Sequence, residues 1–351
     1  MNTNRLMAAF FLLSFMFIGK AQDGNPDSEQ LRLKKESQQA YNEAVEYLTA
    51  DQFQPALSAL DKSIQLQPDF ALAYLQRGKT KFEIKNYFGA EQDYRQAINY
   101  EPALGEAYFA LGYLFFTNDS LIPAKRNFDL AIDKNFTTYY AYYYRGLIKL
   151  NEGDVSGAIL DFNKSIEKKQ DFALAYHDRA SAKVKMNDFT GAIYDYSNAV
   201  NYDPGFVLAY NNMGSAKKQT GDFQGAINDF NTAIQLQPDF FIAFNNRGSA
   251  YYLLGDFEKA EDNFTKCLEI KSDYVPALNN MANLYAKKSD FQKALEFYNQ
   301  SLELEPETGD AYLNRGLTYE MMGQLDNACA DWQKAHELNI QEAEEYLKEC
   351  N

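Results

Sequence analysis

One spacing constrains the fold of this chain more than any other feature: nine alanines stand 34 residues apart, with no insertion or deletion between them. They are Ala56, Ala90, Ala124, Ala158, Ala192, Ala226, Ala260, Ala294 and Ala328. A large side chain follows each alanine by four residues, from Leu60 in the first unit to Trp332 in the last. A fixed period of this length is typical of arrays whose units stack on their neighbours. The sequence therefore predicts one quasi-linear array, although 351 residues would ordinarily suggest two or three globular domains.

Each unit has the spacing of two helices. We number the positions of a unit from 1 and call each position a column. Columns 4, 8 and 11 share one helical stripe, and columns 20, 24 and 27 share another. Gly221-Asp222 separates the two stripes, since Gly fits the left-handed position that closes a helix and Asp caps the next one. Prolines follow five of the second helices: Pro68, Pro102, Pro204, Pro238 and Pro306. The pattern predicts an all-α array of antiparallel helix pairs.

The period divides most of the chain into nine units. They span 37–70, 71–104, 105–138, 139–172, 173–206, 207–240, 241–274, 275–308 and 309–342. The amphipathic residues 343–351 are expected to form a capping helix. Small residues at columns 8, 20 and 27 allow the two helices to approach closely, and the bulky column 24 fills the space between units. Many of the 26 Tyr and 26 Phe residues are therefore packing.

The N-terminus has the pattern of a secretory signal peptide over residues 1–21. Arg5 precedes the apolar run Leu6–Ile18, and Gly19-Lys20-Ala21 then presents small residues ahead of a cut. The run is shorter than the roughly 20 residues that a membrane span needs, with an uncleaved anchor as the alternative. Residues 22–36 are expected to be a polar linker. We expect export to the periplasm, the cell envelope or the medium, with no stable membrane span after cleavage.

Composition argues against several classes of function. Asp and Glu outnumber Lys and Arg by 49 to 34, a net charge of −15, and nucleic-acid binding needs clustered basic charge. Two histidines and three cysteines make a metal site improbable, and we expect no metal and no cofactor. Cys267 occupies a small core column, whereas Cys329 and Cys350 could either pair or stay free.

The pattern resembles the tetratricopeptide repeat family, whose signature is W-x2-L-G-x2-Y, then A-x3-F, then P. The resemblance covers about 37–342. Tyr usually replaces the first Trp, as at Tyr108, and Arg often replaces the Leu before Gly, as at Arg145. The final proline is replaced at Phe136, Gln170, Ser272 and Ile340, so those turns are expected to differ. The resemblance implies a right-handed superhelical solenoid with a concave surface for partners.

In that family, columns 2, 5, 9 and 12 of the first helix line the concave groove. The candidate groove residues are Tyr41, Leu75, Phe82, Phe109, Tyr113, Phe116, Tyr140, Tyr143, His177, Asn211, Asn245 and Asn279. In the first four units the stripe is mostly apolar or aromatic, which favours a docking channel. The alternatives are that the N-terminal linker or self-association covers the stripe, or that superhelical curvature buries it.

In the later units the stripe becomes rich in amides. Asn211, Asn245 and Asn279 recur once per unit, and an amide both donates and accepts hydrogen bonds. The ladder is similar to the asparagine ladders of repeat superhelices that hold unfolded polypeptide. The alternative is that Asn is a common family choice at a solvated position. The Lys and Asn clamp by which some family members grip a C-terminal carboxylate is missing, because column 2 carries no Lys.

Catalysis finds little support in the sequence. The period leaves no insertion for a catalytic domain, and His177, beside Asp178, is better explained as a hydrogen-bonding contact than as a catalyst. We expect a non-catalytic scaffold that binds an extended peptide or a helix of a partner protein in the groove. The alternatives are recognition of an envelope glycan or small ligand by the tyrosine-rich groove, or a non-catalytic subunit of an envelope enzyme or secretion complex.

Overall fold

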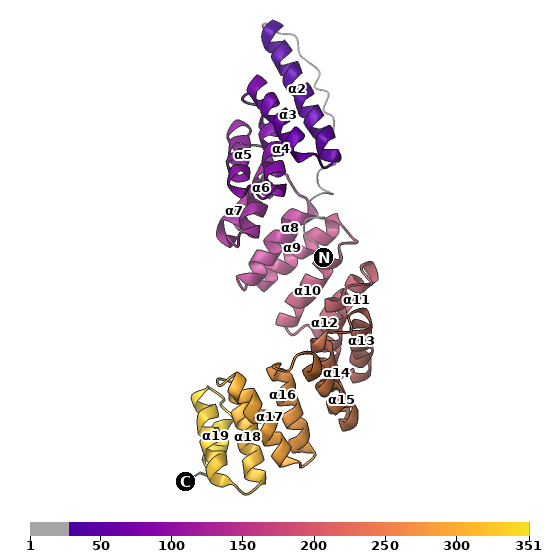
Figure 1. Cartoon of the computed structure of the whole chain (residues 1–351), viewed down its shortest axis with the longest axis vertical. Helices are drawn as coiled ribbons and strands as arrows, with labels where there is room; N and C mark the ends of the chain where they lie inside the picture. Colours follow the sequence, from indigo (N-terminus) through magenta and orange to yellow (C-terminus); the bar gives the residue numbers. More distant parts are fainter. Residues whose placement is uncertain (1–27, 351) are drawn as a thin grey trace. The chain divides into compact units, whose positions relative to one another are not determined.

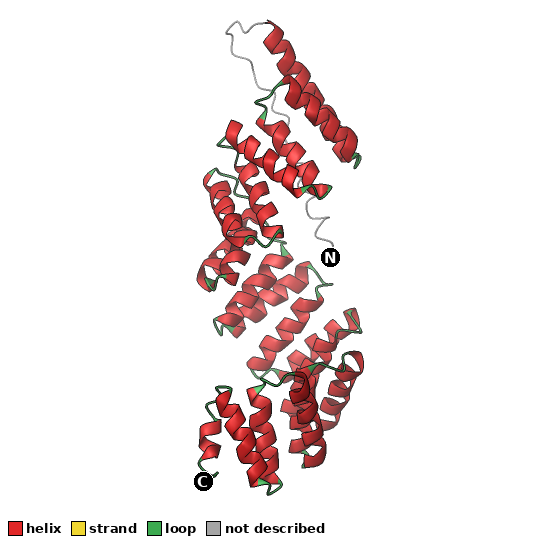
Figure 2. Cartoon of the chain, turned by 60° about the vertical axis from the view of Figure 1, so that its left-hand side comes forward, coloured by secondary structure: helices red, strands yellow, loops and turns green. Residues whose placement is uncertain are grey.

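The computed structural model describes residues 28–350, which contain helices and turns but no strand (Figure 2). The predicted signal peptide and residues 22–27 lie outside the described residues. First helices of the units are α2 (Ser28–Thr49), α4 (Ala71–Glu83), α6 (Gly105–Thr117), α8 (Tyr139–Asn151), α10 (Ala173–Lys185), α12 (Val207–Gln219), α14 (Phe241–Leu254), α16 (Val275–Lys287) and α18 (Gly309–Met321). From α4 to α18, each begins at the first residue of its predicted unit.

Second helices complete the hairpins, and each packs against the first helix of its own unit (Figure 1). They are α3 (Phe53–Leu66), α5 (Tyr87–Tyr100), α7 (Leu121–Asp133), α9 (Val155–Lys168), α11 (Phe189–Tyr202), α13 (Phe223–Leu236), α15 (Phe257–Ile270), α17 (Phe291–Leu304) and α19 (Leu325–Glu337). A short helix, α20 (Ala343–Leu347), follows the last pair. The predicted all-α architecture of helix pairs is confirmed.

The structure corrects the start of the array. Residues 28–36, expected to be polar linker, are helical and form the first part of α2. The segment contains neither Gly nor Pro, and Arg32 forms an ion pair with Glu36 at 3.0 Å, one turn further along the helix. Such i,i+4 pairs stabilise a helix, so the apolar period alone placed the helix start too late.

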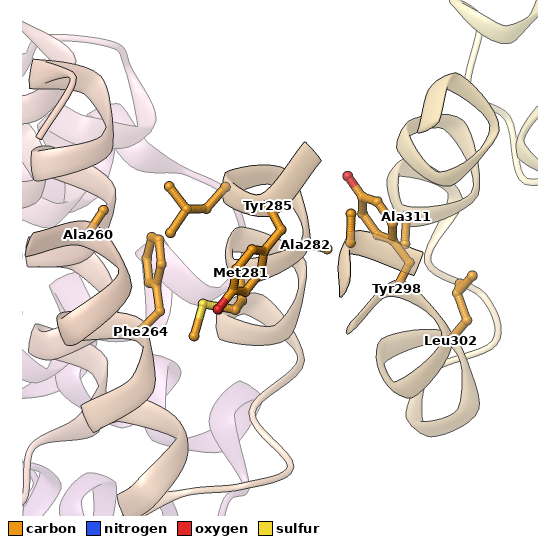
Figure 3. Packing of buried hydrophobic residues seen from close by; sticks show 10 residues of the cluster. Ala260, Phe264, Met281, Ala282, Tyr285, Tyr298, Leu302 and Ala311 are labelled. Atoms are coloured by element: carbon orange, nitrogen blue, oxygen red, sulfur yellow. The ribbon is translucent and has the colours of Figure 1, made fainter. Parts of the chain in front are cut away.

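The described chain divides into two compact units, which we call the N-unit (residues 28–170, α2–α9) and the C-unit (residues 171–350, α10–α20). In both, the core is built from the repeat columns. The nine column-20 alanines are 0% exposed, and so are Phe128, Phe162 and Phe230 at column 24. Figure 3 shows one such cluster in the C-unit, where Phe264 of α15, Met281 of α16 and Tyr298 of α17 fill the space between helices.

The aromatic ring at column 24 explains why column 8 carries a small residue. A Cβ atom built on Gly248 would lie 2.7 Å from Cε1 of Phe264, and one built on Gly214 would lie 2.8 Å from the matching atom of Phe230. Real Cβ atoms do not approach so closely, so a larger residue would force the helix pair apart. The first helix therefore packs closely against the column-24 ring of the second helix in its own unit.

The turn between paired helices has the predicted geometry. Gly221 has a φ of 83°, in the left-handed region, and the next residue, Asp222, accepts a hydrogen bond from the backbone N–H of Gly225 at 2.9 Å.

The turns between units are a separate set. Of the four that lack the usual proline, two have a different backbone conformation. Asn135 and Asn339 end their helices at φ values of 63° and 65°, as Asn tolerates this region better than most residues.

Candidate partner-binding surface

The aromatic stripe of the N-unit is largely buried. Tyr41, Leu75, Phe109, Tyr113, Tyr140 and Tyr143 are 3–8% exposed, while Phe82 and Phe116 are half-buried. The structure therefore does not present the six buried side chains as the open docking channel that we expected. Partner binding through Phe82 and Phe116 stays a prediction.

Ring contacts give the physical reason for this burial. Phe109 lies 5.6 Å from Phe128, and Tyr143 lies 6.0 Å from Phe162, so these two stripe rings contact the core ring of their own unit. Tyr144 joins them, with its centroid 5.0 Å from that of Tyr113. Contacts between aromatic rings add stabilisation beyond that of the area they bury. Here the rings of the stripe and of the core form one cluster.

Three rings of the tyrosine run of α8 pack against one another. The rings of Tyr139 and Tyr140 lie 4.0 Å apart, and Tyr140 stacks on Tyr144 at 5.9 Å. Burial raises the pKa of Tyr144 well above its usual range, which is the expected effect of removing a phenol from water.

The C-unit carries two pockets along its first helices. One, of about 400 Å³, lies among α14, α16 and α18 and is lined by Ser249, Tyr252, Asn280, Asn283 and Asn314, among others. The second, of about 380 Å³, lies between α10 and α12, and includes Ser181, Asn212, Ser215 and Gln219. Both are lined by residues of columns 6, 9, 12 and 13, so the C-unit has a hollowed surface on the side of its first helices. We call this surface the amide groove.

Part of the asparagine ladder joins neighbouring units to each other. Asn211 and Asn245 are only 5% and 6% exposed. The side-chain oxygen of Asn211 accepts a hydrogen bond from Nδ2 of Asn246 at 2.9 Å, and that of Asn245 accepts one from Asn280 at the same distance. These two amides are therefore structural joints, which corrects the expectation that they face a partner.

The amides that reach the pockets are mainly those one residue further along the chain. Asn212, Asn280 and Asn314 stand at column 6 and are half-buried. Asn279, a predicted groove residue, is also half-buried, and its Oδ1 has no hydrogen-bond partner among the described residues. The candidate groove thus retains amide groups that can accept and donate further hydrogen bonds.

His177 is held in place by hydrogen bonds on both ring nitrogens. Nδ1 lies 2.8 Å from a carboxylate oxygen of Asp178, and Nε2 lies 3.1 Å from the amide nitrogen of Asn212 on the next first helix. The ring also packs 4.8 Å from that of Phe206. These contacts link α10 to α12, and partner binding through His177 stays a prediction.

Sequence reasoning missed a set of arginine bridges. Arg145 donates from Nε and Nη2 to Asp161 of its own unit, at 2.8 and 2.6 Å, and from Nη1 to Asp129 of the preceding unit at 2.8 Å. The same arrangement recurs at Arg77, Arg247 and Arg315. The sequence pattern that indicates these bridges is an acidic or amide residue 16 positions before and 16 positions after each column-7 arginine. The bridges connect second helices of successive units to each other.

The two C-terminal cysteines, left open by the sequence, form a disulfide. Cys329 of α19 bonds to Cys350 with a Cα–Cα distance of 5.7 Å, and the ring of Tyr346 on α20 stacks at 5.1 Å on Trp332. The free thiol of Cys267 is fully buried, and burial raises its pKa to about 12.

Within residues 28–350, no helix is long and apolar enough to cross a membrane.

Comparison with known proteins agrees with this architecture. Tetratricopeptide repeat models match residues 239–306 and 297–330, and a TPR repeat model matches 180–221 and 214–255. No match was found among curated proteins.

Solved structures of the same type superpose on much of the chain. A tetratricopeptide repeat protein from Parabacteroides merdae aligns with a TM-score of 0.60 and 18% identity over 70% of this chain and 97% of its own. The C-terminal part of a TPR repeat-containing protein from Cytophaga hutchinsonii aligns at 0.53 and 21%, over 68% and 99%. The APC/C hetero-tetramer Cut9-Hcn1 aligns at 0.57 and 14%, over 93% and 77%.

At these identities the superpositions establish the fold. The matched repeats, the gapless 34-residue period and the succession of helix pairs all point to one architecture, which serves as a scaffold for protein interactions. The family is generally non-catalytic. The chain is a tetratricopeptide repeat protein.

Proposed function

We propose that this protein is a non-catalytic scaffold that holds an extended segment of a partner protein in the amide groove of the C-unit. The observation that carries the proposal is the pair of pockets, of about 400 and 380 Å³, in which asparagine, serine and glutamine side chains lie beside aromatic ones such as Tyr252 and Tyr196. The aromatic stripe of the N-unit is mostly buried, so we place the binding surface in the C-unit.

The chemistry of the groove suits a peptide backbone. Each residue of an extended segment presents one N–H and one C=O that folding has not satisfied. Carboxamides can pair with both groups, and the half-buried Asn280, Asn283 and Asn314 lie together around one pocket. In this kind of recognition, the amides bind the backbone of the peptide. The side chains of the partner then occupy the spaces between helices.

We further propose that the protein acts outside the cytoplasm, in the periplasm or cell envelope. The N-terminal sequence has the pattern of an export signal. The disulfide between Cys329 and Cys350 adds support, because such bonds persist mainly in oxidising compartments.

Peptide selection tests the proposed function. A display library of random 12-residue peptides would be selected against the purified protein and against a variant with Ser249→Trp, which places an indole in the larger pocket. Gln235→Trp on the exposed side of α13 is the matched control. We expect peptides that bind the protein and the control equally, and that lose about ten-fold or more in affinity for Ser249→Trp.

Two results would contradict the proposal. Recovery of no binding peptide at all would argue against peptide capture. Binding that survives Ser249→Trp unchanged would place the binding site elsewhere on the molecule.

A further inference from the structure

The lysines on the first helices of the C-unit fall into two sets. One set has carboxylate partners on the second helices: Lys183 lies 2.7 Å from Asp195, and Lys217 lies 2.7 Å from Asp229. These lysines stand at column 11, beside the core. Their charges are neutralised within their own units.

The other set stands at columns 12 and 13, in the amide groove. Lys185 lines the smaller pocket and Lys287 lines the larger one, whereas Lys218 stands at column 12 of α12, outside both pocket linings. No Asp or Glu in the described part of the chain forms an ion pair with any of these three. The groove therefore holds ammonium groups whose charge is not balanced by the protein.

Lys218 is the most constrained of the three. Its side chain is half-buried, and Nζ donates a hydrogen bond to the hydroxyl of Ser249 on α14 at 3.1 Å. Burial lowers the pKa of Lys218, and no carboxylate offsets the effect. A hydroxyl partner carries no charge, so an incoming anion would recover interaction energy that Lys218 loses by leaving water.

Three of the first helices around the pockets contain no acidic residue. Neither pocket has an Asp or Glu in its lining, and α12, α14 and α16 have none anywhere in their sequences. This is unusual in a chain with 49 acidic residues and a net charge of −15. These three successive first helices carry amide groups, with lysines on α12 and α16, and no carboxylate of their own.

We propose that the amide groove selects extended peptide segments that carry Asp or Glu side chains, with Lys218 receiving one carboxylate beside Ser249 and Lys287 available for another. The inference rests on the proposed function and specifies the class of partner. The two positions differ from those of the Lys and Asn clamp that this sequence lacks. Charge complementarity of this kind contributes to selectivity and to the rate of association.

The selected peptides provide the test. The random library would be displayed with its C-terminus fused, so that only side chains supply carboxylates. We expect Asp and Glu to be enriched in peptides selected on the wild-type protein, and the enrichment to disappear on the Lys218→Gln/Lys287→Gln variant. Lys266→Gln/Lys293→Gln is the matched control, because it removes the same charge from exposed ion pairs on α15 and α17.

Affinity measurements then locate the contact. For the most enriched peptide, replacing its Asp residues by Asn should weaken binding to the wild-type protein about ten-fold, as expected for the loss of a charge-assisted hydrogen bond. The same replacement should change binding to the Lys218→Gln/Lys287→Gln variant by less than about two-fold.

The outcomes separate the two proposals. Peptides that bind in the groove without acidic enrichment would overturn the charge selectivity and leave peptide capture intact. Acidic enrichment that persists on Lys218→Gln/Lys287→Gln would also overturn it. Failure to select any peptide would overturn both proposals together. Circular dichroism of each variant would verify that the helices are retained.

Discussion

Single residues show where a repeat departs from its family signature and what replaces the missing contact. Arg145 occupies the column at which the family has Leu, and its guanidinium connects Asp161 and Asp129 on two successive second helices. An arginine can do this because its planar group donates five hydrogen bonds in a fixed geometry. The sequence showed the substitution, but only the structure shows its partners, since the pairing depends on the relative rotation of three helices.

The bridge should be important for stability. Arg145→Ala leaves Asp161, whose side chain is 4% exposed, with only Lys149 as a partner. We expect a loss of about 3 kcal/mol in the free energy of unfolding, because the buried carboxylate loses two charge-assisted hydrogen bonds and keeps only its ion pair with Lys149. Urea denaturation followed by circular dichroism would measure it. Arg95→Ala, which breaks an exposed pair with Glu91, should cost less than about 1 kcal/mol, and equal losses would refute the interpretation.

Asp229 is the converse case, a buried carboxylate without an arginine. Column 7 of its unit is Met213, and burial raises the pKa of Asp229 despite the nearby Lys217. A raised folded-state pKa means that this group stabilises the fold below its unfolded pKa of about 3.9, and that this stabilisation is lost as pH rises through the folded value.

Asp229→Asn should therefore stabilise the protein at pH 7, by about 0.5–1 kcal/mol, and the gain should shrink toward pH 4. Asn already stands at this column in Asn127 and Asn263, where the amide donates to a carbonyl four residues earlier, at 2.8 and 2.7 Å. The melting temperatures of the wild-type protein and of Asp229→Asn, measured at pH 7 and at pH 4, test this expected gain. Asp161→Asn is the control and should be destabilising, and a gain independent of pH would argue against burial as the cause.

At the scale of elements, the period predicted the helix boundaries well because column 8 and column 24 must meet within each unit. Gly248 and Phe264 show this contact directly. The period could not predict the extension of α2 to Ser28, which lies outside any repeat. It also could not predict that Phe109 and Tyr143 are buried, because columns on the edge of a helical stripe can face either the core or the groove.

The last element, α20, is followed by a covalent link to α19 that the sequence left undecided. Cys350→Ser should release α20 from α19, because a crosslink closing a loop of this size contributes about 3 kcal/mol. Trp332 is the only tryptophan in the chain and is fully buried under Tyr346. We expect a lower melting temperature and a red shift of tryptophan emission.

Dithiothreitol should give the same changes in the wild-type protein, and none in Cys350→Ser. Emission that does not respond either to the reductant or to the substitution would show that α20 is held by packing alone.

At the scale of the whole molecule, the chain is an array in which the two units differ in what their first helices carry. The N-unit uses its aromatic stripe for packing, with Tyr113 and Tyr144 in one ring cluster. The C-unit has amides, hydroxyls and lysines around two pockets. The sequence predicted this change of character along the array, but it assigned the larger role to the aromatic half.

Photo-crosslinking would show whether partners bind the amide groove of the C-unit. A selected peptide carrying a benzophenone at its centre would be irradiated with the protein, and the adducts mapped by mass spectrometry. We predict adducts on α12, α14, α16 and α18, at groove residues such as Ser215, Ser249 and Asn283. Adducts confined to the N-unit or to the second helices α13, α15 and α17 would rule out binding in this groove.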